Sequence, residues 1–268
     1  MMSALLGRHL SGRWNYHSEV EDVTMFTKEC AEIREAVYGV RALTPRGPQQ
    51  SEMTQGSGFM IAPGVVATAA HLVHTEGDTT KPLHVRFEVI RAPEVGAPPT
   101  PASLIGEDIT RDVALLQVPG GPTSACVRLA IDEIPKGTPC GSLGFPFSTT
   151  EPSGAWNLVE RFQHAYVSAL VNDGTTSRYE TDTLMYGGSS GCPGFVDGAL
   201  VIGMQSASRS EPGRPPAPPP PPRKGFRQPK KSRVTQAPTK GTRVAISLWV
   251  PSFEIIAVAK DLKIVGFA

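Results

Sequence analysis

The sequence predicts an all-β fold, a sandwich or a barrel, with one helix before the strands and one after them. Three observations support this prediction. Gly occurs 27 times and Pro 26 times, so the chain is rich in turns. Between these turns lie about ten short segments with the length and apolar pattern of strands. Apolar residues repeat at spacings of three and four in two places, near the start and near the end of the chain.

The first helix is expected from about Glu19 to Glu35, because its apolar stripe follows the helical period: Val20, Val23, Phe26, Cys30, Ile33 and Val37. The expected strands follow at residues 37–43, 56–62, 64–70, 83–90, 112–118, 141–145, 164–170, 178–182, 199–205 and 243–250. The last helix is expected from Ser252 to about Leu262, with Ser252 as its N-cap after Pro251.

Length and composition exclude several classes of protein. A chain of 268 residues forms one large domain or two small ones, and 40% hydrophobic with 19% charged residues excludes a chain disordered throughout or a coiled coil. The uncharged stretch 56–73 is long enough for a membrane span, but Pro63-Gly64 divides it, so we interpret it as a buried β-hairpin. The N-terminus has no apolar core of a secretory signal and only a faint likeness to a transit peptide, so a cytoplasmic protein is expected.

The four cysteines, Cys30, Cys126, Cys140 and Cys192, show neither the spacing of a zinc site nor that of a disulfide framework. We therefore expect reduced thiols. His71 and His74 lie three residues apart, but no third metal ligand is near them in sequence. No metal and no cofactor are expected.

Residues 209–243 differ from the rest of the chain. They hold ten basic side chains and one acidic one, a net charge of +9, which leaves −8 for the remainder. The run Arg214–Arg223 is mostly proline and predicts extended polyproline II, and we expect 209–242 to be a disordered insertion within the fold. Such a segment can be a solvated spacer, bind a module that reads proline-rich motifs, or lie on an anionic surface. Nucleic acid is disfavoured, because Phe226 is its only aromatic residue.

Three motifs carry the chemistry: Gly64-Val-Val-Ala-Thr-Ala-Ala-His71, Asp112-Val-Ala-Leu-Leu-Gln-Val118 and Gly187-Gly-Ser-Ser-Gly-Cys-Pro193. A serine hydroxyl is a poor nucleophile, so acyl transfer needs a base that takes its proton and an acidic group that orients the base. His71, Asp112 and Ser190 are candidates for these roles. Asp108 competes with Asp112, but only Asp112 begins the apolar run.

With these motifs in this order, the chain from about residue 37 to 262 resembles the trypsin-like, chymotrypsin-fold serine proteases, and within them the HtrA-type branch. The resemblance implies two six-stranded antiparallel β-barrels packed face to face. It divides the chain into a flexible tail (1–18), a helix with the first barrel (19–130), and the second barrel with the last helix (131–268). Because the chain ends six residues after that helix, no PDZ domain is expected.

The same resemblance assigns residues to the site. Ser190 would be the nucleophile, His71 the general base and Asp112 its orienting carboxylate, with Ser206 supporting Asp112. The backbone N–H groups of Gly188 and Ser190 would form the oxyanion hole. The specificity pocket would be formed by Leu184, Met204, Ala207 and Ser208. None of them offers a partner to a cation of the substrate, so the pocket would favour a small or medium apolar substrate side chain.

Two departures from the family pattern matter. Ser189 replaces an aspartate that pairs with a newly cut N-terminus in trypsin, so activation by that ion pair is not expected. Cys192 replaces a glycine, but Ser190 already occupies the nucleophile position. The sequence thus predicts a serine endopeptidase acting on polypeptides through an acyl-enzyme. The alternative is a catalytically silent pseudo-protease that acts as a scaffold through its proline-rich loop.

Overall fold

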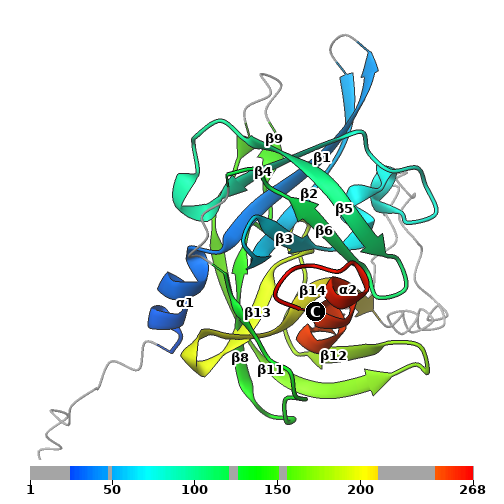
Figure 1. The fold of residues 1–268 in the computed structure, drawn as a ribbon. Coiled ribbons are helices and arrows are strands. Elements are labelled where there is room, and N and C mark those ends of the chain that lie inside the picture. Colours follow the sequence, from blue (N-terminus) through cyan, green and yellow to red (C-terminus); the bar gives the residue numbers. More distant parts are fainter. Residues whose placement is uncertain (1–24, 48–49, 121–125, 151–155, 211–244, 268) are drawn as a thin grey trace, which may run out of the picture.

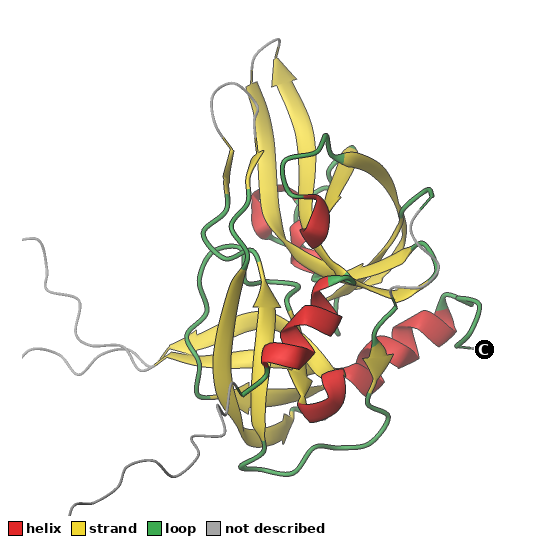
Figure 2. Ribbon diagram, turned by 90° about the vertical axis from the view of Figure 1, so that its left-hand side faces the viewer, coloured by secondary structure: helices red, strands yellow, loops and turns green. Residues whose placement is uncertain are grey.

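A computed structural model of the protein describes residues 25–47, 50–120, 126–150, 156–210 and 245–267. The predicted tail 1–18, the first part of the predicted N-terminal helix and nearly all of the predicted insertion 209–242 lie outside these residues. The strands separate into two barrels, one above the other in Figures 1 and 2, with helical segments at the level where the barrels meet.

Six antiparallel strands close the first barrel in the order β1-β2-β3-β6-β5-β4. Their interior is filled by aliphatic side chains such as Val40, Met60, Val66 and Leu116, all at most 1% exposed. Closure by pairing of β1 with β4 leaves no free edge among these strands. The strands are β1 (Val37–Gly47), β2 (Gln50–Ala62), β3 (Val65–Thr68), β4 (Arg86–Arg91), β5 (Thr100–Asp108) and β6 (Val113–Gln117).

The second barrel also has six antiparallel strands. Its sheet runs in the order β13-β8-β11-β12-β15-β14, and an additional pairing of β13 with β14 closes the ring. The predicted fold class, two six-stranded antiparallel barrels with a helix near each end, is therefore confirmed. The strands are β8 (Pro139–Gly144), β11 (Arg161–Asn172), β12 (Ser177–Thr181), β13 (Pro193–Val196), β14 (Leu200–Ser210) and β15 (Ala245–Pro251).

Three short strands lie outside the two rings. β7 (Arg128–Leu129), in the segment that connects the barrels, adds to β14 in parallel. β9 (Thr149–Thr150) and β10 (Trp156–Asn157) form a separate two-stranded sheet. β14 and β15 stay paired as far as Ser210 and Ala245, so the predicted insertion connects two neighbouring strands of the second barrel.

Two α-helices pack against the barrels. The first, α1 (Thr27–Arg34), follows Phe26, whose ring meets the ring of Phe195 in the second barrel edge-on, with 5.7 Å between centroids. The second, α2 (Ser252–Asp261), buries Ile255, Val258 and Ala259 and contacts strands of both barrels. The described residues also form four short 3₁₀ helices: η1 (Ala70–Val73), η2 (Thr75–Gly77), η3 (Ala92–Glu94) and η4 (Asp197–Ala199).

The prediction that Ser252 caps the last helix is wrong. Its hydroxyl donates to the carbonyl of Ala130 instead, at 2.5 Å, and Pro251 occupies the cap position without a side-chain hydrogen bond. The strand expected at 64–70 is also shorter, because β3 ends at Thr68 and η1 begins at Ala70. His71 therefore lies on a 3₁₀ turn just beyond the end of β3.

No helix in the described part of the chain is both long and apolar enough to span a membrane.

Candidate active site

The candidate site lies where η1 and the turn before β6, both from the first barrel, meet the turn before β13 in the second. His71 Nδ1 lies 3.0 Å from Asp112 Oδ2, and His71 Nε2 lies 2.9 Å from Ser190 Oγ. The backbone N–H of His71 donates to Asp112 Oδ1 at 2.9 Å, which fixes the carboxylate relative to the imidazole. The three predicted side chains thus form one linear hydrogen-bonded chain.

Asp112 is held from two further directions. It occupies the left-handed region with a φ of 53°, closing a turn in which its N–H donates to the carbonyl of Ile109 at 3.2 Å. The hydroxyl of Ser206 donates to Asp112 Oδ2, which is the contact expected for this serine. Asp108 pairs instead with Arg111 and has no described contact with His71.

Electrostatics keep Asp112 ionised. Burial by itself raises the pKa of this carboxyl, since its side chain is only 15% exposed. Hydrogen bonds from His71 and Ser206 and the positive potential of His71 outweigh that effect, and the pKa of Asp112 lies below its ordinary value. A carboxylate in this state is suited to orient and stabilise an imidazolium.

Hydrogen bonds hold four of the five backbone carbonyls of the turn Gly187–Gly191 and two of its five N–H groups. The carbonyl of Gly187 accepts from Phe147 N–H at 2.6 Å, and that of Gly188 accepts from the Ser57 hydroxyl at 3.0 Å. The remaining ties run from Ser189 N–H to Tyr186, from Cys192 N–H to the Ser189 carbonyl, from Ser57 N–H to the Ser190 carbonyl, and from Gly191 N–H to Gln205.

The N–H of the exposed Gly187 has no acceptor within the described residues, and neither do the N–H groups of two half-buried residues, Gly188 and Ser190. The last two are the donors predicted for the oxyanion hole. Buried or half-buried backbone donors are nearly always paired, so two unpaired ones beside a serine hydroxyl are available to a ligand oxygen.

Glycine is required at position 188. Its φ is 92°, and a Cβ there would lie 2.5 Å from the carbonyl oxygen of Phe145. The backbone at this point therefore approaches the segment Phe145–Phe147 more closely than any side chain permits.

Ser189 is fully buried, and its contacts are local. Its N–H donates to the Tyr186 carbonyl at 2.9 Å, and its hydroxyl accepts from Tyr186 N–H at 3.3 Å. These reciprocal bonds close the turn between Tyr186 and Ser189. The described residues show no ion pair at this turn.

The four residues predicted for the specificity pocket are not equivalent. Leu184 is 49% exposed, and Ala207 is also exposed. Ser208 is described by its backbone, which pairs with Ser247. Met204 is fully buried in the hydrophobic core, packed with residues such as Val250 and Ile255.

The remaining candidates from the sequence have structural roles. All four cysteines are free thiols. Cys192 is 2% exposed, and burial raises the pKa of its thiol to about 12, so it stays protonated. His74 is satisfied on both ring nitrogens, by the Lys81 carbonyl at 2.6 Å and by Glu107 at 2.8 Å. The described part of the chain holds no cluster of three or more side chains suited to a metal ion.

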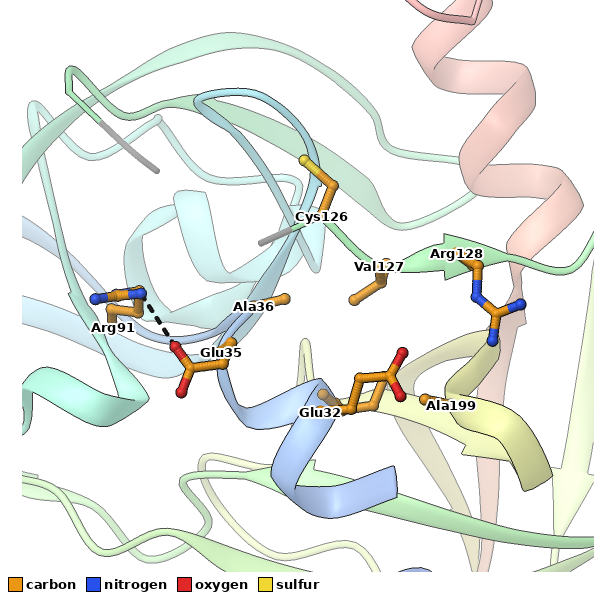
Figure 3. A pocket seen from close by; sticks show the side chains of 9 residues that line it. Glu32, Glu35, Ala36, Arg91, Cys126, Val127, Arg128 and Ala199 are labelled. Atoms are coloured by element: carbon orange, nitrogen blue, oxygen red, sulfur yellow. Dashed lines mark hydrogen bonds and ion pairs between the residues drawn. The ribbon is translucent and has the colours of Figure 1, made fainter. Parts of the chain in front are cut away.

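A cavity of about 440 Å³ lies away from this site, between α1 and the segment that connects the barrels (Figure 3). Its arginines are engaged: Arg91 pairs with Glu35 and Glu94, and Arg128 donates to the Gly198 carbonyl. None of the triad residues lines it.

Sequence reasoning missed three residues that shape the site: Ser57, Phe147 and Gln205. Gln205 is fully buried, bonds Ser142 through its side chain at 2.9 Å, and holds Gly191 and Cys192 through its backbone. For Ser57 a signal existed, since a hydroxyl between Gly56 and Gly58 inside a long uncharged stretch needs a buried partner. For the other two the sequence shows no distinguishing pattern.

Comparison with known proteins agrees with this geometry. The family model described as trypsin-like peptidase domain matches residues 56–204, more than half of the chain. The chain therefore belongs to the trypsin-like peptidase family.

Among solved structures, the active form of the Rv3671c protease from M. tuberculosis is similar with a TM-score of 0.59 and 18% sequence identity, covering 87% of this chain and 83% of that one. An inactive form of the same protease has a TM-score of 0.56 and 17% identity, covering 88% and 92%. At these identities the likeness concerns the fold alone. A search of curated proteins found no match.

Proposed function

We propose that this trypsin-like peptidase is a serine endopeptidase that hydrolyses peptide bonds through an acyl-enzyme. Ser190 is the nucleophile, His71 the general base and then acid, and Asp112 the carboxylate that holds the imidazole in the required tautomer and orientation. The N–H groups of Gly188 and Ser190 form the oxyanion hole.

The steps follow from the contacts. Ser190 Oγ attacks the scissile carbonyl carbon while its proton passes to His71 Nε2, 2.9 Å away. The carbonyl oxygen becomes an oxyanion and takes hydrogen bonds from Gly188 and Ser190. His71 then protonates the leaving amine, which leaves an ester on Ser190. Water, deprotonated by His71, hydrolyses that ester and regenerates the hydroxyl.

One observation carries this proposal. The N–H groups of Gly188 and Ser190, half-buried in the turn Gly187–Gly191, lack a described acceptor and lie beside the same serine hydroxyl that contacts His71. A binding module needs neither an aligned relay nor a pair of unsatisfied donors, because unpaired donors cost stability.

The substrate is a polypeptide, as family membership implies. We expect Leu184, Ala207 and Ser208 at the pocket for the residue before the scissile bond. These residues carry no charge, which favours a small or medium apolar side chain there.

The proposal is tested with a fluorescent fluorophosphonate probe and with fluorescently labelled casein. Wild-type protein is expected to take up one probe and to degrade casein, and Ser190→Ala is expected to do neither. The matched control is Ser168→Ala, which removes an exposed hydroxyl from β11 of the same barrel and should label like wild type.

Folded wild-type protein that takes up no probe would contradict the proposal and favour the scaffold alternative. No contact in the described residues favours that alternative.

A further inference from the structure

Ser57, in β2 of the first barrel, reaches across to the loops of the second barrel. Its side chain is fully buried. The hydroxyl donates to the Gly188 carbonyl at 3.0 Å and accepts from Phe145 N–H at 2.9 Å. The hydroxyl's one proton and one of its two lone pairs are thus used.

The peptide between Gly187 and Gly188 needs such outside restraint. It lies between two glycines, the residues with the greatest conformational freedom, and Gly188 has a φ of 92°. No side chain at either position limits its rotation. Because a trans peptide group is planar, the direction of its N–H is set by what holds its carbonyl.

Two hydrogen bonds supply that restraint. Phe147 N–H holds the Gly187 carbonyl at 2.6 Å, so the Gly188 N–H of the same peptide points the opposite way. The Ser57 hydroxyl holds the next carbonyl, that of Gly188. The direction of the Gly188 N–H is therefore fixed by one hydrogen bond to the peptide group that contains it and by another to the next peptide group.

Ser57 contributes to both restraints. It bonds Gly188 directly, and it also anchors Phe145, which begins the short segment whose Phe147 N–H holds Gly187. The same segment is closed by the Ser148 hydroxyl, which donates to the Phe145 carbonyl at 2.6 Å. Removing the Ser57 hydroxyl would loosen both carbonyl ties together.

We infer that Ser57 is a positioning residue of the oxyanion hole: from the first barrel, its hydroxyl sets the direction of the Gly188 N–H in the second. This inference rests on the proposed function. If it holds, packing of the two barrels has two effects on the site. It brings His71 to Ser190, and it also helps to form the oxyanion hole.

The test is the acylation rate of Ser57→Ala with p-nitrophenyl acetate, measured over a range of ester concentrations. Each rate is divided by the fraction of protein that a fluorophosphonate probe labels at completion, so that it refers to active protein only. The saturating acylation rate should fall about 10- to 100-fold, somewhat less than the about 10²- to 10³-fold typical of losing an oxyanion donor outright. The apparent dissociation constant of the ester should change less than about threefold, because the ground-state carbonyl gains little from the hole.

Two further variants separate positioning from stability. Ser252→Ala removes an almost equally buried hydroxyl, which donates to the Ala130 carbonyl and has no described hydrogen bond to the turn Gly187–Gly191, and should acylate at the wild-type rate. Ser57→Thr keeps the hydroxyl and should acylate faster than Ser57→Ala.

The inference is overturned if folded Ser57→Ala acylates within threefold of wild type, if its loss lies in ester binding, or if Ser252→Ala loses as much. The proposed function fails separately, and the inference with it, if Ser190→Ala still forms the acyl-enzyme.

Discussion

The backbone N–H of Ser57 donates a 2.8 Å hydrogen bond to the carbonyl oxygen of Ser190, joining a strand of one barrel to the candidate nucleophile of the other. The contact is so close that a Cβ on Gly191 would lie 1.8 Å from the Ser57 carbonyl oxygen. Glycine at 191 is therefore a requirement of barrel packing as well as of its φ of 86°. This hydrogen bond fixes the position of Ser190 relative to the first barrel, which also carries His71 and Asp112.

Ser206→Ala should lower kcat about tenfold with little change in KM. Its hydroxyl donates to Asp112, and a hydrogen bond to a charged group contributes about 1.5 to 3 kcal/mol, part of which is retained by the bonds from His71. Steady-state kinetics on a peptide substrate measures the effect. Ser247→Ala, which removes a buried hydroxyl bonded to Trp249, should leave kcat unchanged. A wild-type kcat in Ser206→Ala would show that the contact is not used.

Gly188→Ala should lower the acylation rate by about 10²- to 10³-fold, the size expected for loss of an oxyanion donor. The added Cβ meets the Phe145 carbonyl at 2.5 Å, and alanine resists a φ of 92°, so the peptide must rotate. Gly137→Ala is the control, since Gly137 also has a positive φ, 83°, but open space around its Cβ position. If the two variants acylate equally, backbone strain alone explains the loss.

Iodoacetamide at about pH 8 should leave Cys192 unmodified in the folded protein and leave probe labelling intact. Burial raises the pKa of this thiol to about 12, and the thiolate is the reactive form. Mass spectrometry of tryptic peptides, with a urea-unfolded sample as the positive control, measures the modification. Alkylation of native Cys192 accompanied by loss of labelling would give the thiol a part in the chemistry.

Asp108→Asn should destabilise the protein at neutral pH by about 1 to 2 kcal/mol, and the difference from wild type should shrink in acid. Burial raises the pKa of Asp108, but hydrogen bonds from Arg111 outweigh burial, so its folded pKa lies below the unfolded value. Its stabilisation is thus fully present above about pH 4 and is lost as pH falls through the folded pKa.

Urea unfolding of wild type and Asp108→Asn at about pH 7 and at about pH 3 measures this. A difference that grows toward acid would reverse the sign and contradict the assignment.

Sequence patterns were sufficient for elements with a continuous apolar run or a regular helical period. The strand expected at 112–118 is β6 (Val113–Gln117), with four successive buried residues, and the helix expected from Ser252 is α2. They were insufficient for β5 (Thr100–Asp108), which contains Pro101 and is only partly buried along its length, and for β13 (Pro193–Val196), which begins at a proline. In both strands, pairing with neighbours decides the conformation and the local sequence does not.

The sequence by itself determined the strand-rich architecture and the chemical types available to the site: one imidazole, one carboxylate and one hydroxyl, each in a local motif that a single stretch of chain encodes. The direction of the Gly188 N–H was decided only by the tertiary structure. It depends on Phe147 and on Ser57, residues about 40 and 130 positions away along the chain. A glycine pair has no conformational preference of its own, so only contacts that form when the barrels pack can select one orientation.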